Sequence, residues 1–164
     1  METPSPGPRA SLWTLRVLLT VHVLAVACQP LLAGLFLTGD VDAIAVHGAV
    51  GSSLAAFGLL LIAAALAYVL GGRGRLWVLP VIVVLFLAEG LQIGVGYARE
   101  LQYHVPLGVL IVTSSILLAG WVWTPSARRA RTSRRPMSSP SAPPLTSPPP
   151  PSAPIGSADP RSPR

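Results

Sequence analysis

Residues 91–108, LQIGVGYARELQYHVPLG, leave one apolar segment, turn through a short polar loop and enter the next apolar segment with His104. Gly108 follows this histidine by four residues. The same His-x-x-x-Gly spacing occurs once more, from His47 to Gly51, at the start of another apolar segment. Histidine is a common ligand of metals and of haem iron. The short repeat therefore falls on residues that can bind a cofactor.

The surrounding sequence has the composition of a membrane protein. Apolar residues make up 51% of the 164-residue chain and charged residues only 11%, which leaves too little polar surface for a soluble domain of this size. A transmembrane helix needs about 20 apolar residues, and the segments that reach this length are about 12–37, 43–70, 76–97 and 103–123. We therefore expect an all-α, polytopic membrane protein with a four-transmembrane-helix bundle at 12–124. A disordered N-terminal arm at 1–11 and a disordered, Arg/Pro/Ser-rich cytoplasmic tail at 125–164 complete the expected organisation.

The arginines predict how the bundle is oriented. All 12 basic residues are arginine, and together with the abundant Ala, Pro and Gly this favours a bacterial protein. The cluster at 128–135 falls on the same side as Arg73 and Arg75, so the positive-inside rule places both termini in the cytoplasm and the bundle in the bacterial inner (plasma) membrane. The net charge of +6 is thus interpreted as a membrane anchor and not as a nucleic-acid-binding surface. The aromatic residues expected at the cytoplasmic boundary are Trp13, Tyr68, Trp77, Trp121 and Trp123.

The second and fourth spans run in the same direction, and each carries its histidine near its start. His47 and His104 should therefore lie at similar depths near the outer face, as two axial ligands of one haem require. Gly51 and Gly108 lie one turn further along the same helix faces, where the missing side chain would leave room for the porphyrin edge. The simpler interpretation is a pair of hydrated histidines at the membrane interface beside glycines that permit close helix packing.

These features resemble a known family. Two stretches carry the resemblance: Gln29 to Gly34 followed by His47, and Gln92 to Gly96 followed by His104-Val105-Pro106-Leu107-Gly108. They are similar to one four-helix half of the haem A synthase family and to small four-span bacterial proteins of the same plan. The resemblance covers about residues 12–124, and it implies that His47 and His104 face a haem.

The chain also departs from that family at positions that bear on activity. Ile44 stands where the family has a glutamate, Gly48 stands where it usually has an arginine, and the pair of cysteines in the outer loop is missing, since Cys28 is the single cysteine. The resemblance therefore implies haem binding, whereas the departures argue against haem hydroxylation. No set of residues suggests another catalytic centre, and we predict no catalytic residues.

Other polar residues lie within the apolar segments. Glu89 and Gln92 share one helix face with Gly96, and this face should point into the bundle because a charged group facing lipid costs a few kcal/mol. Glu89 has two open interpretations: proton uptake coupled to haem or quinone redox chemistry, or a structural hydrogen bond. Gln29 is the corresponding polar residue of the first span. His22, nearer the inner side, is interpreted as a buried hydrogen-bonding residue, because the third span has no histidine to match it in a second haem site.

The sequence supports one functional hypothesis and two alternatives. The hypothesis is a bis-histidine haem b protein that serves electron transfer or haem handling, with a redox partner or quinone. The first alternative is an accessory or scaffold protein without a cofactor, and the second is a proton-coupled carrier that uses Glu89 and His22. Gly90 and Gly94 permit a homodimer through a Gly-x-x-x-Gly contact. The run at 148–151 fits a partner that recognises proline motifs, but a solvated tail without a dedicated partner is the preferred interpretation.

Overall fold

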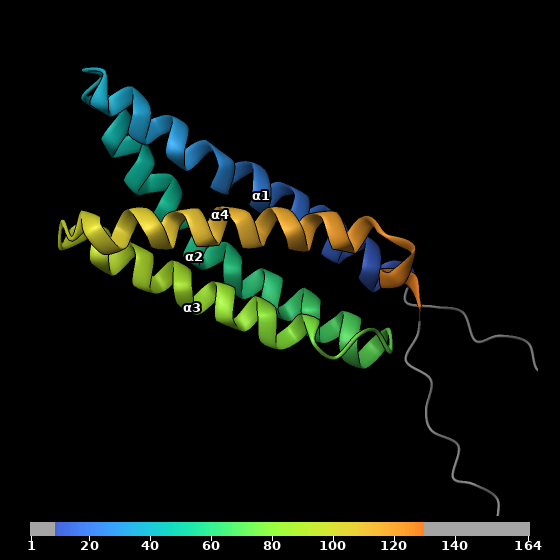
Figure 1. The fold of residues 1–164 in the computed structure, drawn as a ribbon. Helices are drawn as coiled ribbons and strands as arrows, with labels where there is room; N and C mark the ends of the chain where they lie inside the picture. The colour runs from blue at the N-terminus through green and yellow to red at the C-terminus, as the bar shows by residue number, and fades with distance from the viewer. Residues whose placement is uncertain (1–8, 130–164) are drawn as a thin grey trace, which may run out of the picture. The chain divides into compact units, whose positions relative to one another are not determined.

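The structure is a computed structural model that describes residues 9–129, and this range contains helices and short connections without a strand. The long helices are α1 (Arg9–Leu37), α2 (Asp42–Leu66), α3 (Val78–Tyr97) and α4 (Leu101–Trp123) (Figure 1). A π-helical turn, η1 (Ala67–Gly71), continues α2, and a 3-10 turn, η2 (Pro125–Arg128), follows α4. Each long helix is long and apolar enough to cross a membrane. The predicted all-α, polytopic membrane fold is confirmed.

The four long helices pack in a ring. Each helix contacts its two neighbours in the order α1, α2, α3, α4 and back to α1, so that α2 and α4 lie across a diagonal. Short connections reverse the chain after each helix, as in other four-helix bundles. α2 and α4 consequently run in the same direction, as expected for the helices that carry His47 and His104.

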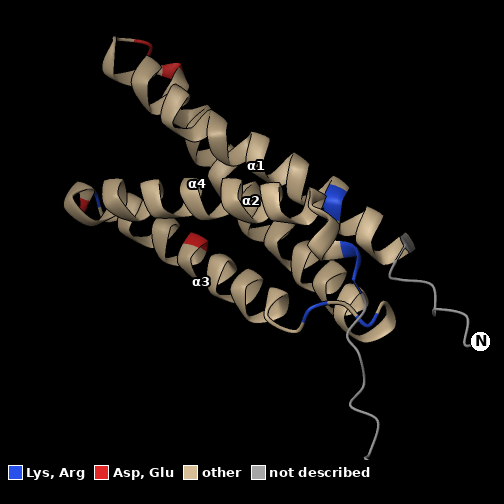
Figure 2. Ribbon diagram, turned by 45° about the vertical axis from the view of Figure 1, so that its right-hand side comes forward, with Lys and Arg blue, Asp and Glu red and all other residues tan. Residues whose placement is uncertain are grey.

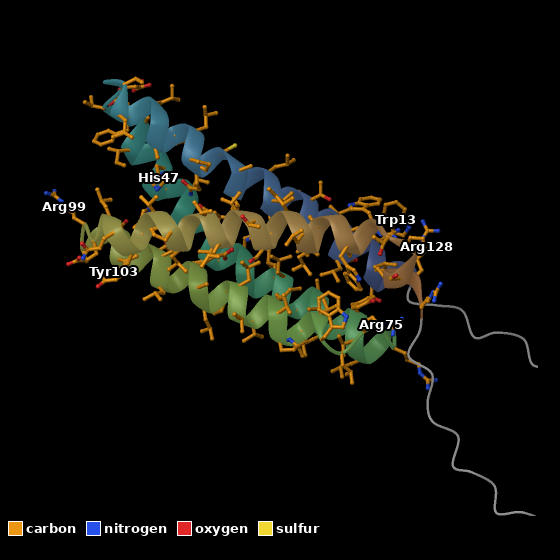
Figure 3. The ribbon with its side chains drawn as sticks, in the orientation of Figure 1. Trp13, His47, Arg75, Arg99, Tyr103 and Arg128 are labelled. Atoms are coloured by element: carbon orange, nitrogen blue, oxygen red, sulfur yellow. The ribbon has the colours of Figure 1, made fainter. Side chains whose placement is uncertain are left out.

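The bundle has two different ends. We name the end with the loops at 38–41 and 98–100 the histidine end, and the end with the connection at 72–77 and with η2 the arginine end. Figure 2 shows the basic residues gathered mainly at the arginine end, whereas the acidic residues lie at the histidine end, apart from Glu89 within α3. Figure 3 shows the same division, with His47 on the side of Arg99 and Tyr103.

The arginine end is closed by buried polar side chains. Arg16 is only 2% exposed, donates a hydrogen bond from Nε to the Val122 carbonyl oxygen at 3.0 Å, and has its guanidinium 4.9 Å from the centre of the Trp123 ring. Tyr68 is 0% exposed and donates from its hydroxyl to the Ala127 carbonyl oxygen at 2.9 Å. Tyr68 thus lies at the end of the bundle where it was predicted, but its ring is buried beneath η2 rather than exposed on the outside of the helices.

The flanking segments differ from the prediction where the structure describes them. α1 begins at Arg9 rather than after a disordered arm at 1–11, and η2 forms within the segment predicted to be a disordered tail. Burial of Ala127 against the bundle explains the second difference, since this contact orders a proline-containing turn. The rest of the arm and of the tail, including the proline run at 148–151, lies outside the described residues.

Candidate functional site

A cavity of about 690 Å³ lies between the four long helices toward the histidine end. All four helices contribute to its lining, and most of the lining side chains are aliphatic. The polar residues that line it include Gln29, His47, Glu89, Gln92 and His104. Binding sites for small molecules and cofactors are typically hollows of roughly 300–1,000 Å³ with apolar walls and a few polar groups. This cavity has the size and the chemical character of such a site.

His47 is fixed to the neighbouring helix by a reciprocal pair of hydrogen bonds. Its ring Nδ1 lies 3.2 Å from the backbone carbonyl oxygen of Gln29 on α1. In return, the side-chain Nε2 of Gln29 donates to the backbone carbonyl oxygen of His47 at 3.3 Å. Since a carbonyl oxygen can only accept, Nδ1 must carry the hydrogen, and Nε2 of the imidazole then keeps a free lone pair.

His104 repeats this arrangement in the other half of the bundle. Its Nδ1 lies 3.0 Å from the backbone carbonyl oxygen of Gln92 on α3, and Gln92 Nε2 donates to the backbone carbonyl oxygen of His104 at 2.9 Å. Histidines that bind metals usually donate their other ring nitrogen to a carbonyl or carboxylate, which fixes the tautomer and the ring orientation. Both histidines are therefore held in the form in which Nε2 can bind a metal.

The two imidazole rings face one another across the bundle. Their centroids are 6.1 Å apart and their planes are inclined by 51°. When two imidazoles bind one metal from opposite sides at about 2 Å each, with each ring centre roughly 1 Å beyond its nitrogen, the centroids lie about 6 Å apart. The observed centroid separation of 6.1 Å matches this spacing, so His47 and His104 are the residues that would hold such a metal.

The nearby glycines make room for these polar side chains. A Cβ at Gly51 would lie 3.3 Å from Gln29 Nε2, and one at Gly108 would lie 2.9 Å from Gln92 Nε2. Both glycines line the cavity, but the nearest group above each is a glutamine amide rather than the open space expected for a porphyrin edge. A Cβ at Gly96 would lie 2.9 Å from the His104 ring, so this glycine admits the imidazole itself.

A second polar pair lies deeper in the bundle. His22 Nε2 on α1 and Glu89 Oε1 on α3 are 2.6 Å apart, and the two residues are only 1% and 4% exposed. Glu89 faces the bundle interior, as predicted from the helix face that it shares with Gln92. The contact itself was not predicted, because His22 was placed by its depth, nearer the inner side, and Glu89 by the helix face that it shares with Gln92.

The structure thus brings the predicted ligand residues together and adds a hydrogen-bonding role of the two glutamines that sequence reasoning missed. Gln29 and Gln92 act on the histidines through both backbone and side chain, and the repeated order of glutamine before histidine was the available signal. Their Oε1 atoms are buried and have no hydrogen-bond partner among residues 9–129. Two unpaired acceptors are therefore buried beside the cavity.

Within the described residues, no three His, Cys, Asp or Glu side chains gather closely enough to hold a metal ion. Two facing imidazoles instead suit a metal that brings its other ligands with it, as haem does. No family profile, no curated protein and no solved structure matches the chain. The resemblance to the haem A synthase family therefore stays a prediction, and the case for a function depends on the site itself.

Proposed function

We propose that this integral membrane protein binds one haem b, with His47 and His104 as the two axial ligands, and serves electron transfer or haem handling. The observation that carries the proposal is the matched pair of anchored imidazoles, with 6.1 Å between ring centroids. Each ring donates through Nδ1 to a backbone carbonyl, so that both Nε2 atoms remain available for iron. Haem, when bound, supplies a centre that takes up and releases one electron.

The residues of the chain hold and shield this centre. Hydrogen bonds from Nδ1 to the carbonyl oxygens of Gln29 and Gln92 orient the two imidazoles and strengthen them as ligands. The cavity that His47 and His104 line is large. Its largely aliphatic lining, which includes Val26, Leu54 and Ile111, limits the access of water. A dry, apolar surrounding is one of the means by which a protein adjusts a haem potential.

Absorption spectra of the detergent-solubilised protein from haem-replete cells test this proposal. The wild type should show the Soret and α bands of low-spin haem, with about one haem per chain expected from one facing histidine pair. His47→Gly and His104→Gly should each lose the low-spin spectrum, because one axial ligand is missing. Added imidazole should restore it, since the free ligand can occupy the space that the side chain has left.

His22→Gln provides the matched control. It removes the third histidine of the chain, which does not line the cavity and contacts Glu89, so the low-spin spectrum should remain. Colourless wild-type protein, or a low-spin spectrum that survives the loss of either His47 or His104, would overturn the proposal. Colourless wild-type protein would leave the accessory or scaffold alternative, which requires no cofactor.

A further inference from the structure

The His22–Glu89 pair has features that a simple structural hydrogen bond leaves unexplained. Within residues 9–129 it is the one pair of oppositely chargeable side chains in ion-pair contact, with 2.6 Å between Nε2 and Oε1. The second polar atoms of the two side chains, His22 Nδ1 and Glu89 Oε2, are buried and have no hydrogen-bond partner in this range. The pair therefore has unused capacity to bind or release a proton.

The pair also lies next to the proposed haem site. Glu89 lines the same cavity as His47 and His104. It precedes Gln92 by three residues, about 4.5 Å along the helix axis, and the Gln92 carbonyl oxygen holds the His104 ring. A charge placed in the cavity is thus close to the pair and is separated from it by protein of low dielectric constant, where Coulomb interactions are strong.

Other charged groups are far along the helices from this pair. The turns of α2 and α4 at 50–62 and 108–119 contain no titratable side chain. On α1, Arg16 is bound to the Val122 carbonyl and Cys28 is exposed. α2 and α4, which also contact α1, carry Asp42, His47, Tyr103 and His104 toward the histidine end, whereas Tyr68 of η1 and Arg128 of η2 belong to the arginine end. Besides the two proposed ligands, a change of charge in the cavity would therefore act mainly on His22 and Glu89.

We infer that the His22–Glu89 pair is a proton-binding site that takes up one proton from water when the proposed haem receives one electron. The inference rests on the proposed haem function. A one-electron reductant supplies the electron, and the proton enters the pair from solvent, so that the added negative charge is balanced within the bundle. Without this uptake the added charge would remain uncompensated in an apolar surrounding, which is unfavourable.

Redox titration of the purified protein followed by absorbance between about pH 5 and 8, the range in which histidine normally titrates, tests the inference. The wild-type midpoint potential should become more negative as pH rises, by up to about 59 mV per pH unit for one proton per electron. Glu89→Gln keeps the size of the side chain and removes the titratable carboxyl, so the slope should largely disappear. Glu100→Gln, which neutralises a carboxyl in the loop at the histidine end, should keep the slope.

Two results overturn the inference, and both are distinct from failure of the proposed function. A wild-type potential that does not change with pH overturns it even if every variant misfolds, and so does a slope that persists in Glu89→Gln. A pH-indicator dye provides a second measurement, because reduction in weakly buffered solution should remove protons from the medium in the wild type. The absence of a haem spectrum would instead overturn both this inference and the proposed function.

Discussion

The two ends of the bundle are built from similar helices but are packed in different ways. At the arginine end, Arg16 and Tyr68 are buried and each donates to a backbone carbonyl, and the rings of Trp77 and Trp121 meet edge to face with centroids 4.5 Å apart. At the histidine end, a cavity of about 690 Å³ separates the helices. The hairpin loops also diverge at this end in Figures 1 and 2.

This contrast assigns different roles to the two ends. Interlocking side chains and hydrogen bonds to backbone carbonyls stabilise the arginine end without any ligand, although Arg16 Nη2 is buried there without a hydrogen-bond partner in the described chain. The histidine end also keeps unpaired buried atoms, Gln29 Oε1 and Gln92 Oε1, beside a hollow that nothing in the described chain fills. Protein interiors are normally packed as densely as organic crystals. A large hollow bordered by anchored histidines is therefore a structural cost that a bound group would offset.

The largest change in stability is expected when a methyl group is added within the densely packed arginine end. A Cβ at Gly74 would lie 2.3 Å from Cζ of the Tyr68 ring, and this ring cannot move away easily because its hydroxyl is bonded to Ala127. Gly74→Ala should therefore lower the free energy of unfolding by about 3 kcal/mol, the upper part of the range for overpacking. Equilibrium unfolding of the purified protein in mixed detergent and SDS micelles measures this change.

Gly71→Ala is the matched control for that experiment. It adds the same methyl group three residues earlier, at the last residue of η1, where nothing lies within 4 Å of the new atom. Its stability should stay within about 0.5 kcal/mol of the wild type, as is usual for surface substitutions. Equal losses for the two variants would show that the arginine end is not tightly packed around Tyr68.

The sequence predicted the fold well, and it predicted that His47 and His104 lie close together. Four apolar segments predicted the four long helices to within a few residues, because an apolar segment of this length satisfies its backbone hydrogen bonds inside a bilayer as a helix. The spacing from His47 to Gly51 and from His104 to Gly108 identified the two residues that the structure brings face to face. The direction of a helix follows from the number of preceding spans, and the depth of a residue follows from its position within its span. Both can be counted along the sequence without coordinates.

Contacts that depend on helix rotation and tilt could not be predicted in the same way. The spans are apolar around most of their circumference, so periodicity gives little information about which face points inward. Counting residues therefore separated His22 from Glu89, although the side chains are in contact. Composition likewise predicted disorder from residue 125 onward and missed the contact between Tyr68 and Ala127 that orders η2.

Filling the cavity at the histidine end should raise the free energy of unfolding, and by less than Gly74→Ala lowers it. Gly48 lines the cavity, and a Cβ there would have nothing within 4 Å. Gly48→Leu should raise the free energy of unfolding by about 1 kcal/mol, because leucine favours helix more than glycine does and covers apolar surface. The same variant should show a weaker haem spectrum or none, since its side chain occupies part of the proposed site. Lower stability together with an unchanged spectrum would contradict both the open cavity and its proposed use.

The smallest change in stability is expected from replacing Gln29 or Gln92. Comparing the two variants compares the α1–α2 half of the histidine end with the α3–α4 half. Gln92 Nε2 donates to His104 at 2.9 Å, whereas Gln29 Nε2 donates to His47 at 3.3 Å, which is near the limit for a hydrogen bond. Gln92→Met should therefore cost about 0.6 kcal/mol, the average for a hydrogen bond between helices in a membrane, and Gln29→Met should cost less. Methionine is similar in size to glutamine and also removes the buried, unpaired Oε1. Each measured loss of stability is therefore the contribution of the Nε2 hydrogen bond minus the stability gained by removing that unpaired acceptor. Parallel unfolding measurements decide between the halves: a larger loss for Gln29→Met would mean that the side-chain hydrogen bond to the His47 carbonyl on α2, not the one to the His104 carbonyl on α4, contributes more to stability.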